Sequence, residues 1–144
     1  MINSYQIVID TNVILAGLRS KNGASYKLLS ILNDKRFQIN ISATLIFEYE
    51  EILKREKQQI GLTNEEIDDI INGICYLANH HDIFYIWRPL AKDKDDDFLI
   101  DLALKCQAQF IISYNDKDLR PIEKFGVSII TPKQFLQLLG EINP

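Results

Sequence analysis

The stretch Tyr5-Gln-Ile-Val-Ile9, followed at once by Asp10-Thr-Asn12-Val13, decides how this 144-residue chain is interpreted. The first five residues form a short β-branched run, which predicts a β-strand. Asp10 would then stand at the carboxyl end of that strand. Because a buried carboxylate is costly without a partner, it needs a cation, a network of hydrogen-bond donors or solvent. The alternative is that Asp10 caps the helical turn that follows.

Strand and helix patterns alternate along the rest of the chain. Apolar or alternating runs predict further strands at residues 37–41, 83–86, 110–113 and 127–130. Apolar stripes with helical spacing run from Ala24 to Leu32, Leu45 to Leu53, Ile67 to Ala78 and about Asp95 to Cys106. Ser42, Thr63 and Thr131 are placed to cap helices, and the helix that begins after Thr131 is expected to be short. This order predicts one domain, residues 1–144, with a parallel sheet covered by helices on both faces.

Composition and charge exclude several classes of protein. Hydrophobic residues make up 47% and charged residues 25% of the chain, and the two cysteines form no CxxC pair. No apolar run approaches the roughly 20 residues of a membrane span, so we expect a soluble, cytoplasmic protein without membrane contact. The net charge of −4 argues against a non-specific nucleic-acid binder, unless cations offset part of the acidic charge.

Acidic side chains from four separate segments are the candidate site: Asp10, Glu48, Asp96 and Asp116. On a helical wheel, Glu48 lies on the flank of its apolar stripe, whereas Glu50 and Glu51 face away. In a parallel sheet, ligands bind at the carboxyl ends of the strands, where Asp10 and Asp116 are expected. Clustered carboxylates without His or Cys favour a hard cation, Mg²⁺ or Mn²⁺, which suits phosphodiester chemistry. His80 and His81 are interpreted as surface residues.

The run at residues 93–97 contains four aspartates. One or two of them could cap the following helix and stabilise its dipole, but four like charges repel one another. This density suggests a bound cation. Asp95 and Asp96 lie nearer the apolar side of the predicted helix, so they are preferred as inward-facing carboxylates.

Several of these segments resemble motifs of PIN-domain nucleases. Ile9-Asp10-Thr11-Asn12-Val13 resembles the opening motif of that family, and Glu48 matches the acidic residue of its second helix. Residues 95–99 resemble the third motif and residues 110–119 the fourth. Residues 126–135 resemble the end of stand-alone PIN proteins that are the toxin components of toxin–antitoxin pairs.

The resemblance implies a three-layer α/β/α sandwich with a central, mainly parallel sheet. It also implies a metal-dependent endoribonuclease that uses one or two Mg²⁺ or Mn²⁺ ions, with RNA as substrate, a cognate antitoxin as partner and a homodimer as assembly. Asp10, Glu48 and Asp96 match the main acidic positions, with Asp95 as the alternative to Asp96. The fourth position aligns through Asp116 or through Asn115 and Asp118. The positions that match supporting polar residues are Asn12, Ser113 and Asn115.

Two other interpretations are carried forward. One is a haloacid-dehalogenase-like phosphatase in which Asp10 is the nucleophile, although Asn12 stands where the acid/base aspartate belongs. The other is a catalytically silent interaction module with the PIN fold. If the substrate is RNA, the candidate phosphate contacts are Arg19, Lys21, Arg88, Lys92, Lys117 and Arg120.

Overall fold

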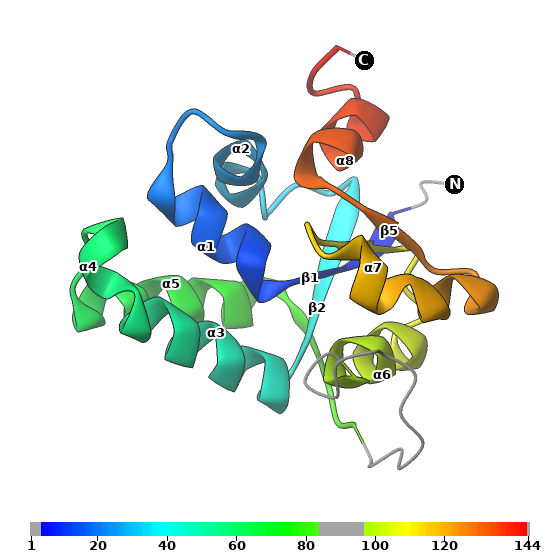
Figure 1. Cartoon of the computed structure of the whole chain (residues 1–144), viewed down its shortest axis with the longest axis horizontal. Helices are drawn as coiled ribbons and strands as arrows, with labels where there is room; N and C mark the ends of the chain where they lie inside the picture. The colour runs from blue at the N-terminus through cyan, green and yellow to red at the C-terminus, as the bar shows by residue number, and fades with distance from the viewer. Residues whose placement is uncertain (1–3, 84–96, 144) are drawn as a thin grey trace.

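A five-stranded parallel sheet forms the centre of the computed structural model, which describes residues 4–83 and 97–143 (Figure 1). Its strands are β1 (Tyr5–Ile9), β2 (Phe37–Ser42), β3 (Asn79–His81), β4 (Phe110–Ile112) and β5 (Ser128–Ile130). The strand order is β3-β2-β1-β4-β5, and every neighbouring pair is parallel. β1 is therefore the central strand, and its carboxyl end is flanked by the ends of β2 and β4.

Helices cover both faces of this sheet, as the sequence predicts. They are α1 (Thr11–Arg19), α2 (Ala24–Ser30), α3 (Ala43–Arg55), α4 (Lys57–Ile60), α5 (Asn64–Leu77), α6 (Asp97–Lys105), α7 (Asp116–Leu119), the 3₁₀ segment η2 (Arg120–Phe125) and α8 (Pro132–Leu139). α1 and α2 lie on one side of β1 and α6 on the other (Figure 1). This confirms the three-layer α/β/α class. In the part of the chain that the structure describes, no helix is long and apolar enough to cross a membrane.

The predicted helix caps are confirmed. Ser42 accepts a hydrogen bond on its side chain from the amide of Leu45, at 3.3 Å, and so begins α3. Thr63 and Thr131 each form a capping box with the residue three positions later, at the start of α5 and α8. These caps determine where the helices leave the sheet, and for α3 the cap determines where Glu48 lies.

The structure corrects the sequence prediction in two places. α1 was not predicted; Asp10 stands at its N-cap but makes no side-chain capping hydrogen bond, and the first turn has no acidic residue. A strand at Asn79–His81, which was not predicted, pairs with β2, whereas the strand predicted at 83–86 falls on residues of which 84–86 lie outside the described part. The edge strand β3 consists of polar residues, so the apolar pattern of the sequence does not reveal it. It is joined to β2 by its side chains as well, since His81 Nε2 lies 2.8 Å from Asn40 Oδ1. The two histidines therefore belong to the sheet.

The amino end of the sheet is filled by an aromatic cluster. Phe135 of α8 is fully buried and packs edge-on against Tyr5, Phe37 and Phe110, with ring centroids 5.3 to 6.2 Å apart. On the α1 side, a Cβ at Gly17 would lie 2.5 Å from Leu29 Cδ1, so glycine permits the close approach of α1 and α2. The core thus supports the strands from the amino end and leaves polar residues at the carboxyl end.

Candidate active site

Asp10 lies at the carboxyl end of the central strand, between β1 and α1. Its side chain is only 6% exposed, and its amide donates to the Ile112 carbonyl of β4 at 2.9 Å. Asp10 occupies the N-cap position of α1, but its side chain makes no capping hydrogen bond there. The helix-cap alternative therefore does not explain this carboxylate.

Three donors hold the Asp10 carboxylate. Ser113 Oγ, at the end of β4, donates to Asp10 Oδ2 at 2.7 Å, and Asn12 Nδ2 lies 3.3 Å from the same oxygen. The backbone amide of Thr11 also donates to the carboxylate. These bonds fix the orientation of the carboxylate through two different strand ends. Of the three polar residues predicted to support the site, Asn12 and Ser113 are thus in contact with Asp10.

Burial dominates the electrostatics of Asp10. Desolvation raises the pKa of its carboxyl above 3.8, and the hydrogen bonds from Ser113 and Thr11 offset only part of that rise. Among the described residues, no Lys, Arg or His forms an ion pair with it. A buried carboxylate without a cationic side chain is a site whose charge a bound cation would stabilise.

Glu48 reaches the same region from α3. Its carboxylate accepts a hydrogen bond from the hydroxyl of Thr11, the residue directly after Asp10. The next residue of α3, Tyr49, is fully buried and donates its hydroxyl to the Ile9 carbonyl at the end of β1. Burial, followed by the negative charges of Asp10 and Glu48, raises the pKa of Tyr49 well above 10. The hydroxyl of Thr11 therefore joins Glu48 to the residue that follows Asp10.

The turn after β4 extends this network. Ser113 Oγ accepts from the Asn115 amide at 2.9 Å, and Asn115 Nδ2 donates to Asp118 Oδ2 at 3.1 Å. The side chain of Asp116 is instead 61% exposed and lies 3.3 Å from Arg120. Of the two candidates for the fourth carboxylate, the structure connects Asp118 to Asp10 and turns Asp116 toward a surface arginine.

The aspartates at 93, 95 and 96 lie outside the described residues, so their place relative to Asp10 stays a prediction. Within the described part of the chain, no three His, Cys, Asp or Glu side chains are grouped closely enough to hold a metal ion. The side chains of the described site that could bind a metal ion all offer oxygen atoms, which are the ligands that Mg²⁺ and Mn²⁺ prefer. A ligand set that includes a carboxylate of the predicted third motif therefore stays a prediction.

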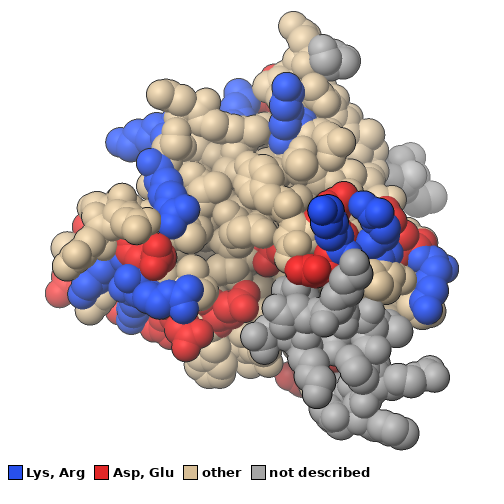
Figure 2. Space-filling view, viewed as in Figure 1, with Lys and Arg blue, Asp and Glu red and all other residues tan. Residues whose placement is uncertain are grey.

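Basic side chains do not gather into one stripe on the face shown in Figure 2, where Lys and Arg are interleaved with Asp and Glu among the described residues. Arg19 is hydrogen-bonded to Glu56 and Gln59, at 3.2 and 2.9 Å. Lys21 and Lys117 are exposed, and Arg88 and Lys92 lie outside the described part. On this face, the described cations therefore form no continuous basic groove.

Thr11 is the site residue that sequence reasoning missed. It was part of the opening motif, but nothing in the spacing showed that its hydroxyl meets Glu48, 37 positions away. Its burial is consistent with that role, since only 5% of the residue is exposed. A hydroxyl directly after a buried strand-end carboxylate is the signal that could have pointed to it.

The fold and the buried strand-end carboxylate place this chain among α/β proteins that carry an acidic centre. The chain matches the PIN domain family over residues 6–117 and belongs to that family, whose members are nucleases. Nucleases of this family generally use divalent metal ions. This assignment argues against the phosphatase interpretation of Asp10.

Three known proteins illustrate the similarity. The uncharacterized protein MJ1680 of Methanocaldococcus jannaschii is 25% identical over 145 residues, which cover 92% of this chain and 90% of that protein. VapBC2 from Rickettsia felis, solved bound to a DNA fragment from its promoter, contains a chain with a TM-score of 0.59 and 14% identity, covering 88% of this chain and 98% of that one. VapBC-1 from nontypeable Haemophilus influenzae gives the same TM-score and identity, with 89% and 98% coverage. At this identity the two structures show a shared fold.

Proposed function

We propose that this protein is a metal-dependent endoribonuclease that hydrolyses RNA phosphodiester bonds, and that it is the toxin of a toxin–antitoxin pair. One observation carries the proposal: a buried carboxylate at the end of the central strand has no cationic side chain among the described residues and is held by Ser113 and Asn12. The chain belongs to a family of nucleases, which supports a role for this carboxylate in cleaving a nucleic acid. The RNA substrate would place the protein in the cytoplasm.

In this proposal Asp10 and Asp96 hold the cation, with Asp95 as the alternative to Asp96. A divalent ion bound there would lower the pKa of a water molecule and stabilise charge on the phosphate and leaving oxygen. Ser113 and Asn12 keep the Asp10 carboxylate in one orientation, so little reorganisation is needed when substrate binds. Thr11 holds Glu48 in place, and Glu48 is then positioned to orient the attacking water.

The fourth carboxylate can be assigned by the contacts of the β4 turn. We assign it to Asp118 in preference to Asp116, because Asp118 is linked through Asn115 and Ser113 to Asp10. An Asp118→Asn variant is expected to lose more cleavage activity than Asp116→Asn. Equal loss in both variants, or greater loss in Asp116→Asn, would reverse the assignment.

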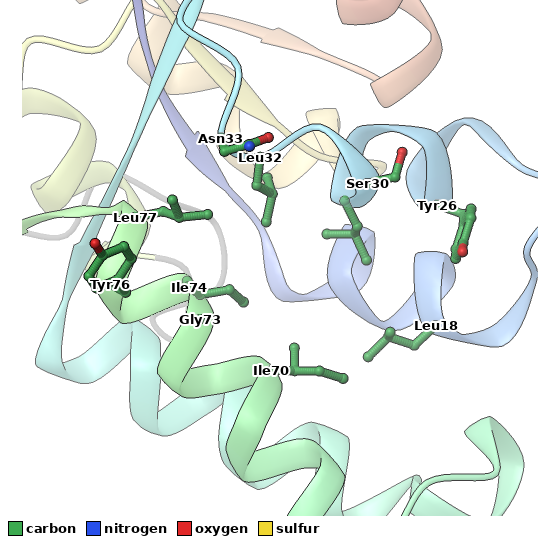
Figure 3. A pocket seen from close by; sticks show the side chains of 11 residues that line it. Leu18, Tyr26, Ser30, Leu32, Asn33, Ile70, Gly73, Ile74, Tyr76 and Leu77 are labelled. Atoms are coloured by element: carbon green, nitrogen blue, oxygen red, sulfur yellow. The ribbon is translucent and has the colours of Figure 1, made fainter.

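An apolar groove supports the proposed protein partners, an antitoxin and a second copy of the chain. It has a volume of about 640 Å³ and is lined by side chains of α1, α2 and α5, with Leu18, Ile70 and Ile74 pointing toward its interior (Figure 3). Tyr76 on its rim is 89% exposed. Exposed apolar surface of this kind is typical of protein interfaces. The two solved VapBC structures provide the analogy for an antitoxin.

The test is cleavage of single-stranded RNA by the purified protein with Mg²⁺ or Mn²⁺. Asp10→Asn keeps the shape of the side chain but removes its charge, so cleavage should be abolished while the folded structure is retained by circular dichroism. The matched control is Asp69→Asn, because Asp69 is an exposed carboxylate on α5. Undiminished cleavage by Asp10→Asn would refute the proposal. If calorimetry shows no Mg²⁺ or Mn²⁺ binding to the wild-type protein at millimolar levels, the chain is a silent interaction module.

A further inference from the structure

A second hollow, distinct from the groove of Figure 3, lies beside α3 and has a volume of about 580 Å³. We infer that it binds one nucleobase of the RNA strand, next to the cleaved bond, with Phe47 as the stacking surface. This inference rests on the proposed nuclease function and specifies how its substrate is bound. The residues that line the hollow are Thr44, Phe47, Glu48, Glu51, Ile52, Arg55 and Phe98.

One side of α3 supplies most of this lining. Thr44, Glu48, Glu51 and Arg55 follow one another at spacings of four, three and four residues, so they form a single stripe along the helix. Phe98, in the first turn of α6, closes the hollow from the other side. The hollow is thus built on two helices of the scaffold.

Glu48 makes this hollow continuous with the candidate active site. It lines the hollow and also accepts the hydroxyl of Thr11, the residue next to Asp10. A strand with its scissile phosphate at Asp10 would therefore have a neighbouring nucleotide at the mouth of the hollow. No comparable link joins the groove of Figure 3 to Asp10, because its lining contains no carboxylate.

Phe47 has the exposure expected of a stacking surface. It is 68% exposed, although it is a large apolar residue. It comes directly before Glu48 in α3. Exposed aromatic rings hold nucleobases by face-to-face contact in proteins that bind single strands, and this contact tolerates any base. Phe98, half-buried at the other wall, limits how deep a ring could enter.

The charges of the lining select a base rather than a phosphate. Glu48 and Glu51 would repel a phosphate inside the hollow, whereas their oxygens can accept hydrogen bonds from the amino groups of a base. Arg55 lies 3.7 Å from Glu56 and is 65% exposed, so its guanidinium is available at the rim for the backbone phosphate. The occupant that fits is an uncharged aromatic ring attached to a charged backbone.

The experiment compares Phe47→Ala with wild type on a set of single-stranded RNA oligonucleotides. Each oligonucleotide carries one abasic nucleotide at a different position around the cleaved bond. Phe47→Ala should lower kcat/KM on intact RNA by roughly 5- to 150-fold, the range for loss of one stacked base. Wild type should show a similar loss with the abasic nucleotide at one position, and Phe47→Ala should lose nothing further there. Phe47→Trp should restore cleavage.

The matched control is Phe125→Ala. Phe125 is also an exposed phenylalanine, at 52%, but it ends η2 just before β5 begins and so lies at the amino edge of the sheet, away from Asp10. The Phe125→Ala variant should cleave RNA as wild type does. Phe47→Ala and Phe125→Ala should both melt at the wild-type temperature, since neither ring is buried. A second readout uses Asp10→Asn protein, in which Phe47→Ala should weaken RNA binding measured by fluorescence anisotropy.

The outcomes separate this inference from the proposed function. If wild type cleaves RNA but Phe47→Ala cleaves equally well, or its loss is the same at every abasic position, the stacking inference is wrong while the nuclease proposal stands. If Phe47→Ala impairs only the binding of a protein partner, the hollow is a docking site and the inference is also overturned. If wild type cleaves no RNA with Mg²⁺ or Mn²⁺, both fail together.

Discussion

Replacing Asp10 by Asn should make the metal-free protein more stable at neutral pH. Asp10 is 6% exposed, and burial raises the pKa of its carboxyl. Its ionised form is therefore less favourable in the folded chain than in the unfolded chain. An asparagine keeps an oxygen that can accept from Ser113 and removes the buried charge. The gain should be of the order of 1 kcal/mol, by comparison with the cost of leaving buried polar groups incompletely satisfied.

The pH dependence of this difference has a definite sign. A carboxyl with a raised folded pKa destabilises the protein as pH rises above its unfolded value, 3.8, and the penalty is complete once pH exceeds the folded pKa. The variant and the wild type should therefore have similar stability near pH 3. The stability advantage of Asp10→Asn should grow as pH rises and then level off.

A divalent cation should reverse the order of stability. An ion present at 100 times its dissociation constant stabilises the folded state by about 2.7 kcal/mol. For a domain of this size that corresponds to an increase in Tm of about 8–10 °C. Wild type should show this increase with Mn²⁺, and Asp10→Asn should show little of it, because its amide carries no charge.

The assay is thermal unfolding followed by circular dichroism, with and without Mn²⁺, and with Asp69→Asn as the surface control. Asp69→Asn should respond to Mn²⁺ as wild type does. Two results would refute the reasoning. One is an equal Mn²⁺ response in wild type and Asp10→Asn, which would place the ion elsewhere. The other is a metal-free Asp10→Asn protein that is less stable than wild type at pH 7, which would mean that the carboxylate is already compensated.

Three further predictions concern the scaffold. Tyr49→Phe should lower the free energy of unfolding in urea by about 1–2 kcal/mol, because the Ile9 carbonyl loses its hydroxyl donor, and no change would mean that this bond is dispensable. Phe135→Ala should lower it by about 3–5 kcal/mol by opening a cavity in the aromatic cluster, whereas a loss below 1 kcal/mol would contradict that packing. Asp34→Asn should lower the Tm slightly at pH 7. That deficit should disappear as pH falls from about 4 to 2, since Arg36 lowers the pKa of Asp34 to about 2, and a deficit that persists below pH 2 would exclude the ion pair as its cause.

Much of the fold could be predicted because local signals and tertiary structure agree. The strands at Tyr5–Ile9 and Phe110–Ile112 are short runs whose last residues, Ile7–Ile9 and Ile111–Ile112, are buried and adjacent in the sheet. Ser42, Thr63 and Thr131 cap their helices with the bonds that their side chains suggest. The strand-end rule placed Asp10 at the carboxyl end of β1, and the family resemblance marked Ser113 as a supporting residue; the structure joins the two by a hydrogen bond of 2.7 Å.

Other features could not be predicted because they depend on partners distant in the chain. α1 has no cap of its own and is held by packing against α2 and α3, and β3 is a polar edge strand recognised by its pairing with β2. The contact of Thr11 with Glu48 joins residues 37 positions apart on two helices. Periodicity could place Glu48 on the flank of α3, but it could not identify which side chain that flank would meet.

The choice between Asp116 and Asp118 shows what the structure adds at the site. Both lie in the same turn, so strand order and spacing alone allow either of them. α7 begins at Asp116, which places that side chain one turn before Arg120, and the two residues pair at 3.3 Å on the surface. Asp118 instead accepts a hydrogen bond from the side-chain amide of Asn115, and the backbone amide of Asn115 donates to Ser113 Oγ. Since Ser113 also donates to Asp10, any charge at Asp118 is linked to the buried carboxylate through two intervening residues, and a charge at Asp116 is not.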